Sequence, residues 1–286
     1  MAVILVGMMF TVALGLRLSD FSNVRNAPIR VVGGVLTQLI GLPLLTLGLI
    51  LILGPPASIA LGMIVVASCP GGNVSNLLTL FARGHAAYSV SLTAISSVVS
   101  AVLTPVSIFV WSSMYGPTAS LIDRLDIQPW PFITQTVGLL AIPLVAGMLV
   151  AAHLPRIAER LRKVLMPLAL FGLMVLIVVG AATNWGIILA TGTIIIPLVF
   201  IHNAAAFGLG SAAGRVLRMD VAHRRSLTFE VGIQNSGLGL LILLSQFEGL
   251  GGAAAITGMW SLWHLVAGVA LVGLFRALDW RTLKPS

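Results

Sequence analysis

Charged residues are scarce in this chain, because only 8% of its 286 residues are Asp, Glu, Lys or Arg while 58% are hydrophobic. The mean hydropathy of +1.07 excludes a soluble globular domain, whose surface needs far more charge. The single cysteine, Cys69, excludes an internal disulfide and a clustered thiolate metal site. The five histidines form no i, i+4 pair and no HExxH motif, which disfavours a zinc enzyme.

The chain instead contains long stretches of apolar residues. A helix that crosses a bilayer needs roughly 20 mostly apolar residues. Nine stretches of this kind span residues 1–16, 31–53, 59–81, 86–111, 132–151, 164–182, 187–210, 226–247 and 253–275. We therefore predict an all-α polytopic membrane protein with nine transmembrane helices. The first stretch lacks the basic start and the cleavage site of a signal peptide, so we interpret it as a retained helix.

The basic residues fall almost entirely into alternate loops. Of the 16 Lys and Arg residues, 15 lie in the first, third, fifth and seventh loops or in the tail, and only Arg124 lies on the other side. Cytoplasmic loops carry an excess of Lys and Arg, so the amino terminus is predicted outside and the carboxyl terminus in the cytoplasm. Topology explains the net charge of +8, and a nucleic-acid partner is not expected.

The predominance of arginine over lysine, without a long polar tail or a transit peptide, favours a bacterial inner membrane. The lipid bilayer is then the surrounding partner. Nothing in the sequence indicates an obligate protein partner.

Two of the apolar stretches carry a polar motif near their middle. The third contains residues 68–76 (SCPGGNVSN), and the eighth contains residues 230–237 (EVGIQNSG). Proline removes a backbone donor and glycine weakens a helix, so both spans are predicted to unwind at mid-membrane. A simple proline kink is the alternative for one motif alone. Two interrupted spans in corresponding positions of two halves are typical of transporters built from inverted repeats.

Glu230 is the one acidic residue deep in an apolar stretch. A charge at the bilayer centre costs on the order of 3 kcal/mol or more, so such residues usually mark ion or substrate pathways. The polar side chains near the two motifs all offer oxygen, and they are Gln38, Ser75, Asn76, Ser89, Thr93 and Gln234. This ligand set favours sodium. A protonated Glu230 in a proton-coupled carrier stays open as the alternative.

Two other functional classes stay open at this point. A passive channel would use the same polar midplane, although it would not need paired interrupted helices around one carboxylate. An intramembrane hydrolase would need an activated serine or paired acids, and no GxSxG motif is present. Structural roles also compete, since hydroxyls such as those of Ser89 and Thr93 commonly bond to their own helix. We interpret His202 and Asn203 as a satisfied packing pair.

Several motifs taken together are specific, and they comprise residues 18–21 (LSDF), 69–72 (CPGG), 75–76 (SN), 82–84 (ARG), 230–237 (EVGIQNSG) and 263–264 (WH). With these motifs the chain resembles the bile acid:sodium symporter family, and its bacterial members in particular, over nearly the whole length. The resemblance implies sodium-coupled symport of an organic anion by alternating access. The anion would be bile acid-like or a smaller carboxylate.

The resemblance also implies two domains with inverted repeats. A panel domain would comprise residues 1–30 and 132–182. A core domain would comprise residues 31–113 and 187–275, with the two broken helices crossing inside it. Residues 276–286 would form a cytoplasmic tail. Bacterial members often have ten spans, so whether an additional helix precedes the first span stays an open question.

Two sodium sites follow from the same resemblance. The first would use Ser75, Asn76, Ser89, Thr93 and Glu230, and the second would use Gln38, Gln234, Glu230 and the backbone carbonyls of Val231 and Ile233. Two sodium ions and one shared carboxylate leave a net charge of +1, which a monovalent anion would neutralise.

Asn73, Asn235 and His264 would contact the substrate. Leu265 stands where the family often has asparagine, and Asn73 stands where threonine is frequent. Bile acids themselves are therefore not assumed to be the substrate.

Overall fold

The computed structural model describes residues 2–17, 20, 27–183, 185–247 and 250–283. Its elements are α1 (Ala2–Ala13), α3 (Pro28–Leu36), the π-helix η2 (Thr37–Gly41), α4 (Leu42–Leu53), α5 (Ala57–Ser68), α6 (Asn73–Phe81), α7 (Ala86–Ser113), α8 (Gly116–Arg124), α9 (Pro129–His153), α10 (Pro155–Thr183), α11 (Trp185–Val216), α12 (Val221–Gly232), α13 (Ser236–Gln246) and α14 (Gly251–Leu283). Within the described residues the chain is thus helical, as predicted, apart from one isolated antiparallel bridge.

Helices occupy each of the nine predicted stretches. Within the residues that the structure describes, five helical segments are long and apolar enough to cross a bilayer. These five cover Pro28–Leu53, Ala86–Ser113, Pro129–His153, Ala190–Val216 and Gly251–Trp280. The protein is therefore a multi-pass membrane protein, while the count of nine spans stays a prediction. The short helix α8, with mixed polarity, was not predicted. Helix α14 also continues to Leu283, beyond the predicted end of its span at residue 275.

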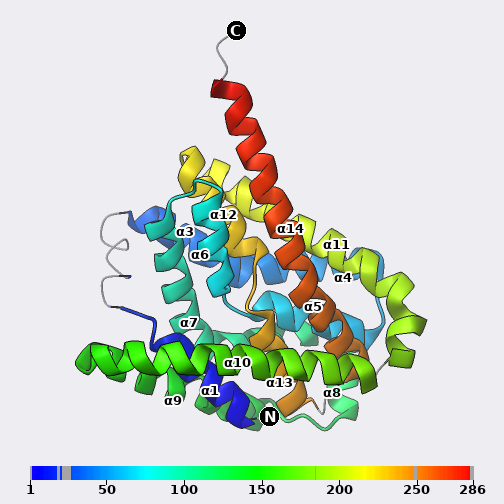
Figure 1. Cartoon of the computed structure of the whole chain (residues 1–286). Coiled ribbons are helices and arrows are strands. Elements are labelled where there is room, and N and C mark those ends of the chain that lie inside the picture. Colours follow the sequence, from blue (N-terminus) through cyan, green and yellow to red (C-terminus); the bar gives the residue numbers. More distant parts are fainter. Residues whose placement is uncertain (1, 18–19, 21–26, 184, 248–249, 284–286) are drawn as a thin grey trace.

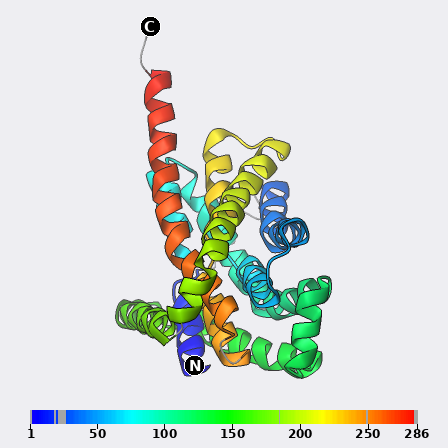
Figure 2. The ribbon, with the colours of Figure 1, turned by 90° about the vertical axis from the view of Figure 1, so that its right-hand side faces the viewer.

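Helices α1, α9 and α10 pack on one another, and they contact the other helices mainly through α7, α13, α11 and α14. Helix α1 packs on α9 and α10, and α10 lies across them at one end of the molecule (Figure 1). Helix α14 packs on α5, α11 and α13 and ends at the opposite pole from the start of α1 (Figure 2). The predicted division into panel and core stays a prediction. Residues 18–19 and 21–26 of that panel and residues 284–286 of the tail lie outside the described residues.

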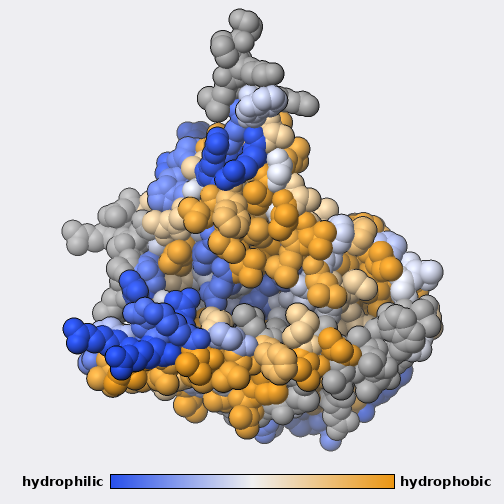
Figure 3. All heavy atoms as spheres, in the orientation of Figure 1, coloured by the Kyte–Doolittle hydropathy of each residue, from blue (hydrophilic) through white to orange (hydrophobic). Residues whose placement is uncertain are grey.

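Buried apolar side chains gather in clusters between these helices. One cluster surrounds the fully buried Trp260 of α14 and includes residues of α4, α5, α7, α11 and α12. A second contains Leu61 of α5 and joins α1, α7, α9 and α13. Apolar side chains also cover much of the outer surface of α10 and α14 (Figure 3). An apolar exterior of this kind suits a surface that faces lipid.

Both predicted interruptions occur, and the two unwound segments pair with each other. The Gly72 N–H donates to the Ile233 carbonyl at 3.0 Å, and the Asn235 N–H donates to the Pro70 carbonyl at 2.8 Å. In an apolar surrounding, backbone groups released from a helix need partners within the protein. Each break supplies partners for the other, and this pairing fixes α5–α6 and α12–α13 where they cross.

A π-helical turn interrupts the span Pro28–Leu53, and the sequence did not predict it. The Leu42 N–H donates to the carbonyl of Thr37, five residues earlier. Pro43 follows directly and offers no N–H to the carbonyl four residues before it. Turns of this kind often occur at functional sites. Here the turn carries Gln38, which is fully buried.

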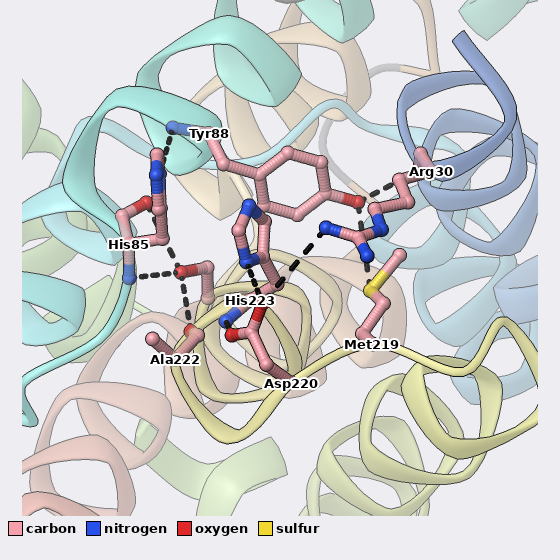
Figure 4. Close-up of polar contacts among 8 residues, drawn as sticks. Arg30, His85, Tyr88, Met219, Asp220, Ala222 and His223 are labelled. Atoms are coloured by element: carbon pink, nitrogen blue, oxygen red, sulfur yellow. Dashed lines mark hydrogen bonds and ion pairs between the residues drawn. The ribbon is translucent and has the colours of Figure 1, made fainter. Parts of the chain in front are cut away.

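A polar cluster attaches the start of α12 to α3 and α7 (Figure 4). One carboxylate oxygen of Asp220 accepts from the His223 N–H at 3.0 Å, and the other lies 2.6 Å from His223 Nδ1 and 3.8 Å from Arg30 Nη1. The His223 ring stacks on His85 with centroids 4.2 Å apart. The Tyr88 hydroxyl donates to the Arg30 carbonyl at 2.7 Å. These contacts fix the first turn of the half-helix that carries the buried acid.

The cluster changes the pKa of two groups outside the predicted spans. The hydrogen bond from the His223 backbone holds the pKa of Asp220 below its usual value. Partial burial lowers the pKa of His223, although the Asp220 carboxylate opposes this shift. His223 therefore resists protonation in the folded chain.

We predict that His223 makes stability fall as the pH drops below about 6.5. The folded-state pKa of His223 lies below its unfolded value near 6.5, so the unfolded chain takes up a proton that the folded chain does not. This stability is present above the unfolded pKa and is lost as the pH falls toward the folded one. His223→Gln should flatten the dependence of melting temperature on pH between about 7.5 and 5.5. The exposed His153→Gln should keep the wild-type slope, and identical slopes in all three proteins would contradict the prediction.

Candidate functional site

Glu230 is fully buried in the last turns of α12, and hydroxyl groups surround its carboxylate. The Ser75 hydroxyl of α6 donates to Oε2 at 2.7 Å, and the Thr93 hydroxyl of α7 lies 2.9 Å from each carboxylate oxygen. None of the ion pairs among the described residues includes Glu230. A buried carboxylate without a cationic side chain requires a proton or a bound cation.

Oxygen atoms outnumber protons around Thr93. Its hydroxyl lies within hydrogen-bond distance of both Glu230 oxygens, of the Ser89 carbonyl at 3.1 Å and of Asn76 Oδ1 at 3.3 Å. A hydroxyl has one proton, so it can satisfy only one of these acceptors at a time. The other oxygens face one another without a donor from Thr93. Such a concentration of acceptors suits a cation.

Three buried amides on the other side of the break show the same surplus of acceptors. Their nitrogens hold backbone carbonyls of the α12 end: Gln38 Nε2 donates to Glu230 at 3.3 Å, Gln234 Nε2 to Val231 at 2.7 Å and Asn203 Nδ2 to Gly232 at 2.8 Å. Their oxygens, Gln38 Oε1, Gln234 Oε1 and Asn203 Oδ1, have no hydrogen-bond partner within the described part of the chain. A buried acceptor without a partner costs about 1–3 kcal/mol. A cation would satisfy them.

Gly71 allows the α5–α6 break to touch the carboxylate. A Cβ atom at this position would overlap Glu230 Oε1 and would lie 2.9 Å from Gln38 Nε2. Any side chain would therefore push the acid and the π-helical amide apart. The absence of a side chain brings both breaks and the π-helix into one site.

The structure brings the predicted sodium ligands together at the crossing of the two breaks. Ser75 and Asn76 lie on α6, Ser89 and Thr93 on α7, Gln38 on η2, and Glu230, Val231, Ile233 and Gln234 at the end of α12. The carbonyls of Val231 and Ile233 already accept hydrogen bonds from Gln234 and Gly72. A cation there would use their second lone pairs.

The predicted substrate contacts are less concentrated. Asn73 is exposed at the first residue of α6, and Asn235 is half-buried and caps α13 by accepting from the Leu238 N–H at 3.1 Å. Both flank the crossing. His264 is buried on α14, and none of the hydrogen bonds among the described residues joins it to the Glu230 cluster.

Two residues belong to the site although the sequence analysis did not assign them to it. Thr79 is buried on α6, four residues after Ser75, and its hydroxyl lies 3.2 Å from the Ser89 hydroxyl. Its position one helical turn after Ser75 could have identified Thr79 from the sequence. Asn203 was interpreted as one of a satisfied packing pair, but its nitrogen donates to the Gly232 carbonyl at the break and its oxygen has no partner among the described residues. His202 contacts the Thr46 hydroxyl at 2.7 Å through one ring nitrogen, while its Nδ1 is unpaired in the described chain.

Comparison with known families decides the class of protein. The family model described as Sodium Bile acid symporter family matches residues 2–191. The chain belongs to this family. The Sodium Bile acid symporter family consists of transporters, so the intramembrane hydrolase is set aside. The matched region ends before Glu230, and the role of that residue therefore rests on the geometry described above.

Relatives in several kingdoms carry names that agree with the family. The chain is 30% identical over 263 residues to "Uncharacterized sodium-dependent transporter YocS" of Bacillus subtilis (strain 168), covering 92% of the chain and 78% of that protein. It is 28% identical over 269 residues to "Probable sodium/metabolite cotransporter BASS1, chloroplastic" of Arabidopsis thaliana, covering 94% of the chain and 64% of the plant protein. It is 25% identical over 283 residues to "Ileal sodium/bile acid cotransporter" of Cricetulus griseus, covering 97% and 78%.

We predict that Gly71→Ala destabilises the protein by about 1–3 kcal/mol, because the new methyl group overlaps the Glu230 carboxylate. Gly48→Ala in α4 is a matched control, since a Cβ there meets no atom within 4 Å. Thermal unfolding of the purified proteins in detergent compares the two. The control should melt at or above the wild-type temperature. Equal melting temperatures for both variants would contradict the close approach at Gly71.

Proposed function

We propose that this protein is a sodium-coupled symporter that carries an organic anion into the cell by alternating access. The observation that carries the proposal is the fully buried Glu230 carboxylate at the crossing of two helix breaks, with a surplus of oxygen acceptors and no ion-pair partner among the described residues. The names of the relatives, which specify sodium-dependent transport or sodium cotransport, support the same conclusion.

Sodium is a transported ion in this scheme, and two ions share Glu230. The hydroxyl side of the carboxylate offers Ser75, Asn76, Ser89 and Thr93, and the amide side offers Gln38, Gln234 and the carbonyls of Val231 and Ile233. Two monovalent cations beside one carboxylate leave a net charge of +1. A monovalent anion restores neutrality, which explains physically why substrate and sodium would enter together.

The half-helices give the anion a place to bind. Helices α6 and α13 both begin at the crossing, so their positive amino-terminal ends point toward it. No side chain caps α6, whereas Asn235 caps α13. The exposed Asn73 marks the uncapped end and is the favoured substrate contact. The anion would be bile acid-like or a smaller carboxylate, with His264 as a further candidate contact from α14.

Coupling follows from the number of elements that meet at the ions. The carboxylate of α12 contacts α6 and α7, and its backbone contacts η2, so a bound cation would draw four elements together. An anion that requires the same arrangement binds more tightly when sodium is present, and the effect is reciprocal. Movement of a core (31–113 and 187–275) against a panel (1–30 and 132–182) would then expose the site to each side. The packing of α1 on α9 and α10 supports this division.

We propose a bacterial inner membrane as the location, with the amino terminus outside and the carboxyl terminus in the cytoplasm. The sorting of basic residues into alternate loops supports this orientation. The positions of the first and last helices at opposite poles of the molecule agree with it (Figure 2).

We predict that sodium raises the melting temperature of the purified protein and that potassium and choline do not. At a sodium concentration of 100 times Kd, one site stabilises the folded state by about 2.7 kcal/mol. Glu230→Gln should abolish the shift because it removes the charge that both ions share. The exposed Asp123→Asn of α8 should retain the full shift. A wild type that responds to pH but not to sodium would instead favour the proton-coupled carrier.

We further predict that the wild-type response to sodium is cooperative, because two ions assemble the same elements. A sodium titration followed by thermal shift or by tryptophan fluorescence should give a Hill coefficient clearly above 1 and no higher than about 2. Gln38→Ala should lower it to about 1 while leaving a sodium-specific response at the hydroxyl side. The exposed Gln128→Ala serves as the control. A wild-type coefficient of about 1 that Gln38→Ala leaves unchanged would contradict the two-ion arrangement.

A further inference from the structure

A cavity separate from the sodium site lies where the carboxyl-terminal ends of α1 and α9 meet the start of α10. Its volume is about 540 Å³. The lining comes from residues 14–17, from 148–152 and from 155–162, and includes none of the residues around Glu230. Leu14, Met148 and several alanines make its inner wall apolar, while Arg17, Arg156 and Arg162 provide positive charge. The cavity thus combines an apolar wall with a strongly basic rim.

The positive charge of this cavity is not neutralised by its own acid. Three arginines and Glu159 line it, which leaves an excess of two positive charges. Glu159 lies 3.0 Å from Lys163, and this contact lowers the pKa of the Glu159 carboxyl. The Asp20 carboxylate accepts from the Arg17 backbone at 2.8 Å. None of the ion pairs among the described residues includes a side chain of the three arginines.

Gly15 lets one of these arginines enter the lining. A Cβ atom on Gly15 would lie 2.9 Å from Cζ of the Arg162 guanidinium, so the guanidinium rests directly on the backbone at the end of α1. The positive amino-terminal end of α10 lies beside it, since Pro155 and Arg156 also line the cavity. A planar guanidinium presents paired donors that match the oxygens of a phosphate. The rim therefore suits a phosphate group.

The depth of the cavity indicates where that phosphate comes from. The predicted spans 1–16 and 132–151 end at the cavity, and the predicted span 164–182 begins just after it. The cavity thus adjoins three predicted span ends, which would place it in the headgroup region of a bilayer. Other side chains of α9, which do not line the cavity, are apolar and exposed, namely Leu149 (54% exposed), Val145 (54%) and Ile142 (71%). In Figure 3 the hydrophilic end of α10 lies beside an apolar surface.

We propose that this cavity binds the headgroup of an anionic phospholipid, with the phosphate at Arg156 and Arg162 and an acyl chain against α9. Basic pockets between membrane helices on the cytoplasmic side are suited to such headgroups. A zwitterionic headgroup carries its own cation and gains less from the excess positive charge. Since the fifth loop is predicted in the cytoplasm, the lipid belongs to the inner leaflet. The proposal does not depend on sodium coupling, because the two sites share no residue.

The test is a titration of the purified full-length chain in neutral detergent with short-chain phosphatidylglycerol, short-chain phosphatidylcholine and glycerol phosphate, read by thermal shift. Phosphatidylglycerol should bind about tenfold more tightly than phosphatidylcholine. Arg156→Gln and Arg162→Gln should each weaken its binding about fivefold. Arg215→Gln, an exposed arginine at the end of α11 and outside the cavity, should leave it unchanged.

Equal binding of the two lipids, or binding of phosphatidylglycerol that survives both cavity substitutions, would overturn the proposal. Glycerol phosphate binding as tightly as the lipid would assign the cavity to a free anion and would equally overturn it. If a variant does not fold, the comparison of the two lipids on the wild-type protein tests the proposal by itself. Phosphatidylglycerol binding that does not weaken with rising salt would exclude the contact with arginine.

Discussion

The arrangement at the centre of this protein depends on one carboxylate, Glu230, that has no cationic side-chain partner among the described residues. Glu230 accepts from Ser75 and Thr93, yet the donors around it are fewer than the oxygens they face. Removing a charge from water is expensive unless it is paired. The hydroxyls of Ser75 and Thr93 lie at the carboxylate, while the nearby buried amides use their nitrogens to hold carbonyls at the α12 end and leave their oxygens without a partner among the described residues. A carboxylate in this setting therefore needs a proton or a bound cation.

At the same place, the two helix breaks satisfy each other's backbone hydrogen-bonding groups. Unwinding a helix within an apolar region releases N–H and carbonyl groups, and each break alone would leave them unpaired. Residues 70–72 and 233–235 supply hydrogen bonds to each other, and Asn203 satisfies the carbonyl of Gly232. The lack of a side chain at Gly71 then brings this paired backbone against the acid. Fold stability and ion chemistry thus place constraints on the same few residues.

The sequence predicted the parts of this arrangement that have a local cause. Pro70 and its neighbouring glycines, and the glycines after Glu230, interrupt apolar stretches whatever surrounds them, so both breaks and the deep acid were found. Pro43 was an unused local signal for the π-turn at Gln38. The role of Asn203, by contrast, depends on a partner far along the chain, and no local pattern indicated it. The same holds for Arg225, which donates to the Ala82 carbonyl at 2.8 Å and to both oxygens of Asp279.

These long-range contacts bear on how the proposed sodium ions would leave the site. Helix α12 contacts α6 near both of its ends, through Ser75 and Glu230 at the crossing and through Arg225 and the Ala82 carbonyl at the other end. Separating α6 from α12 would break both contacts together. The π-helical Gln38 meets the site through one long hydrogen bond of 3.3 Å, and α7 meets the carboxylate through Thr93. Helix α7 is also held to α12 near both ends of α12, through Thr93 at the crossing and through His85 at the start of α7. We infer that α6, α7 and α12 move as one unit and that displacement of η2 would open the proposed ion site.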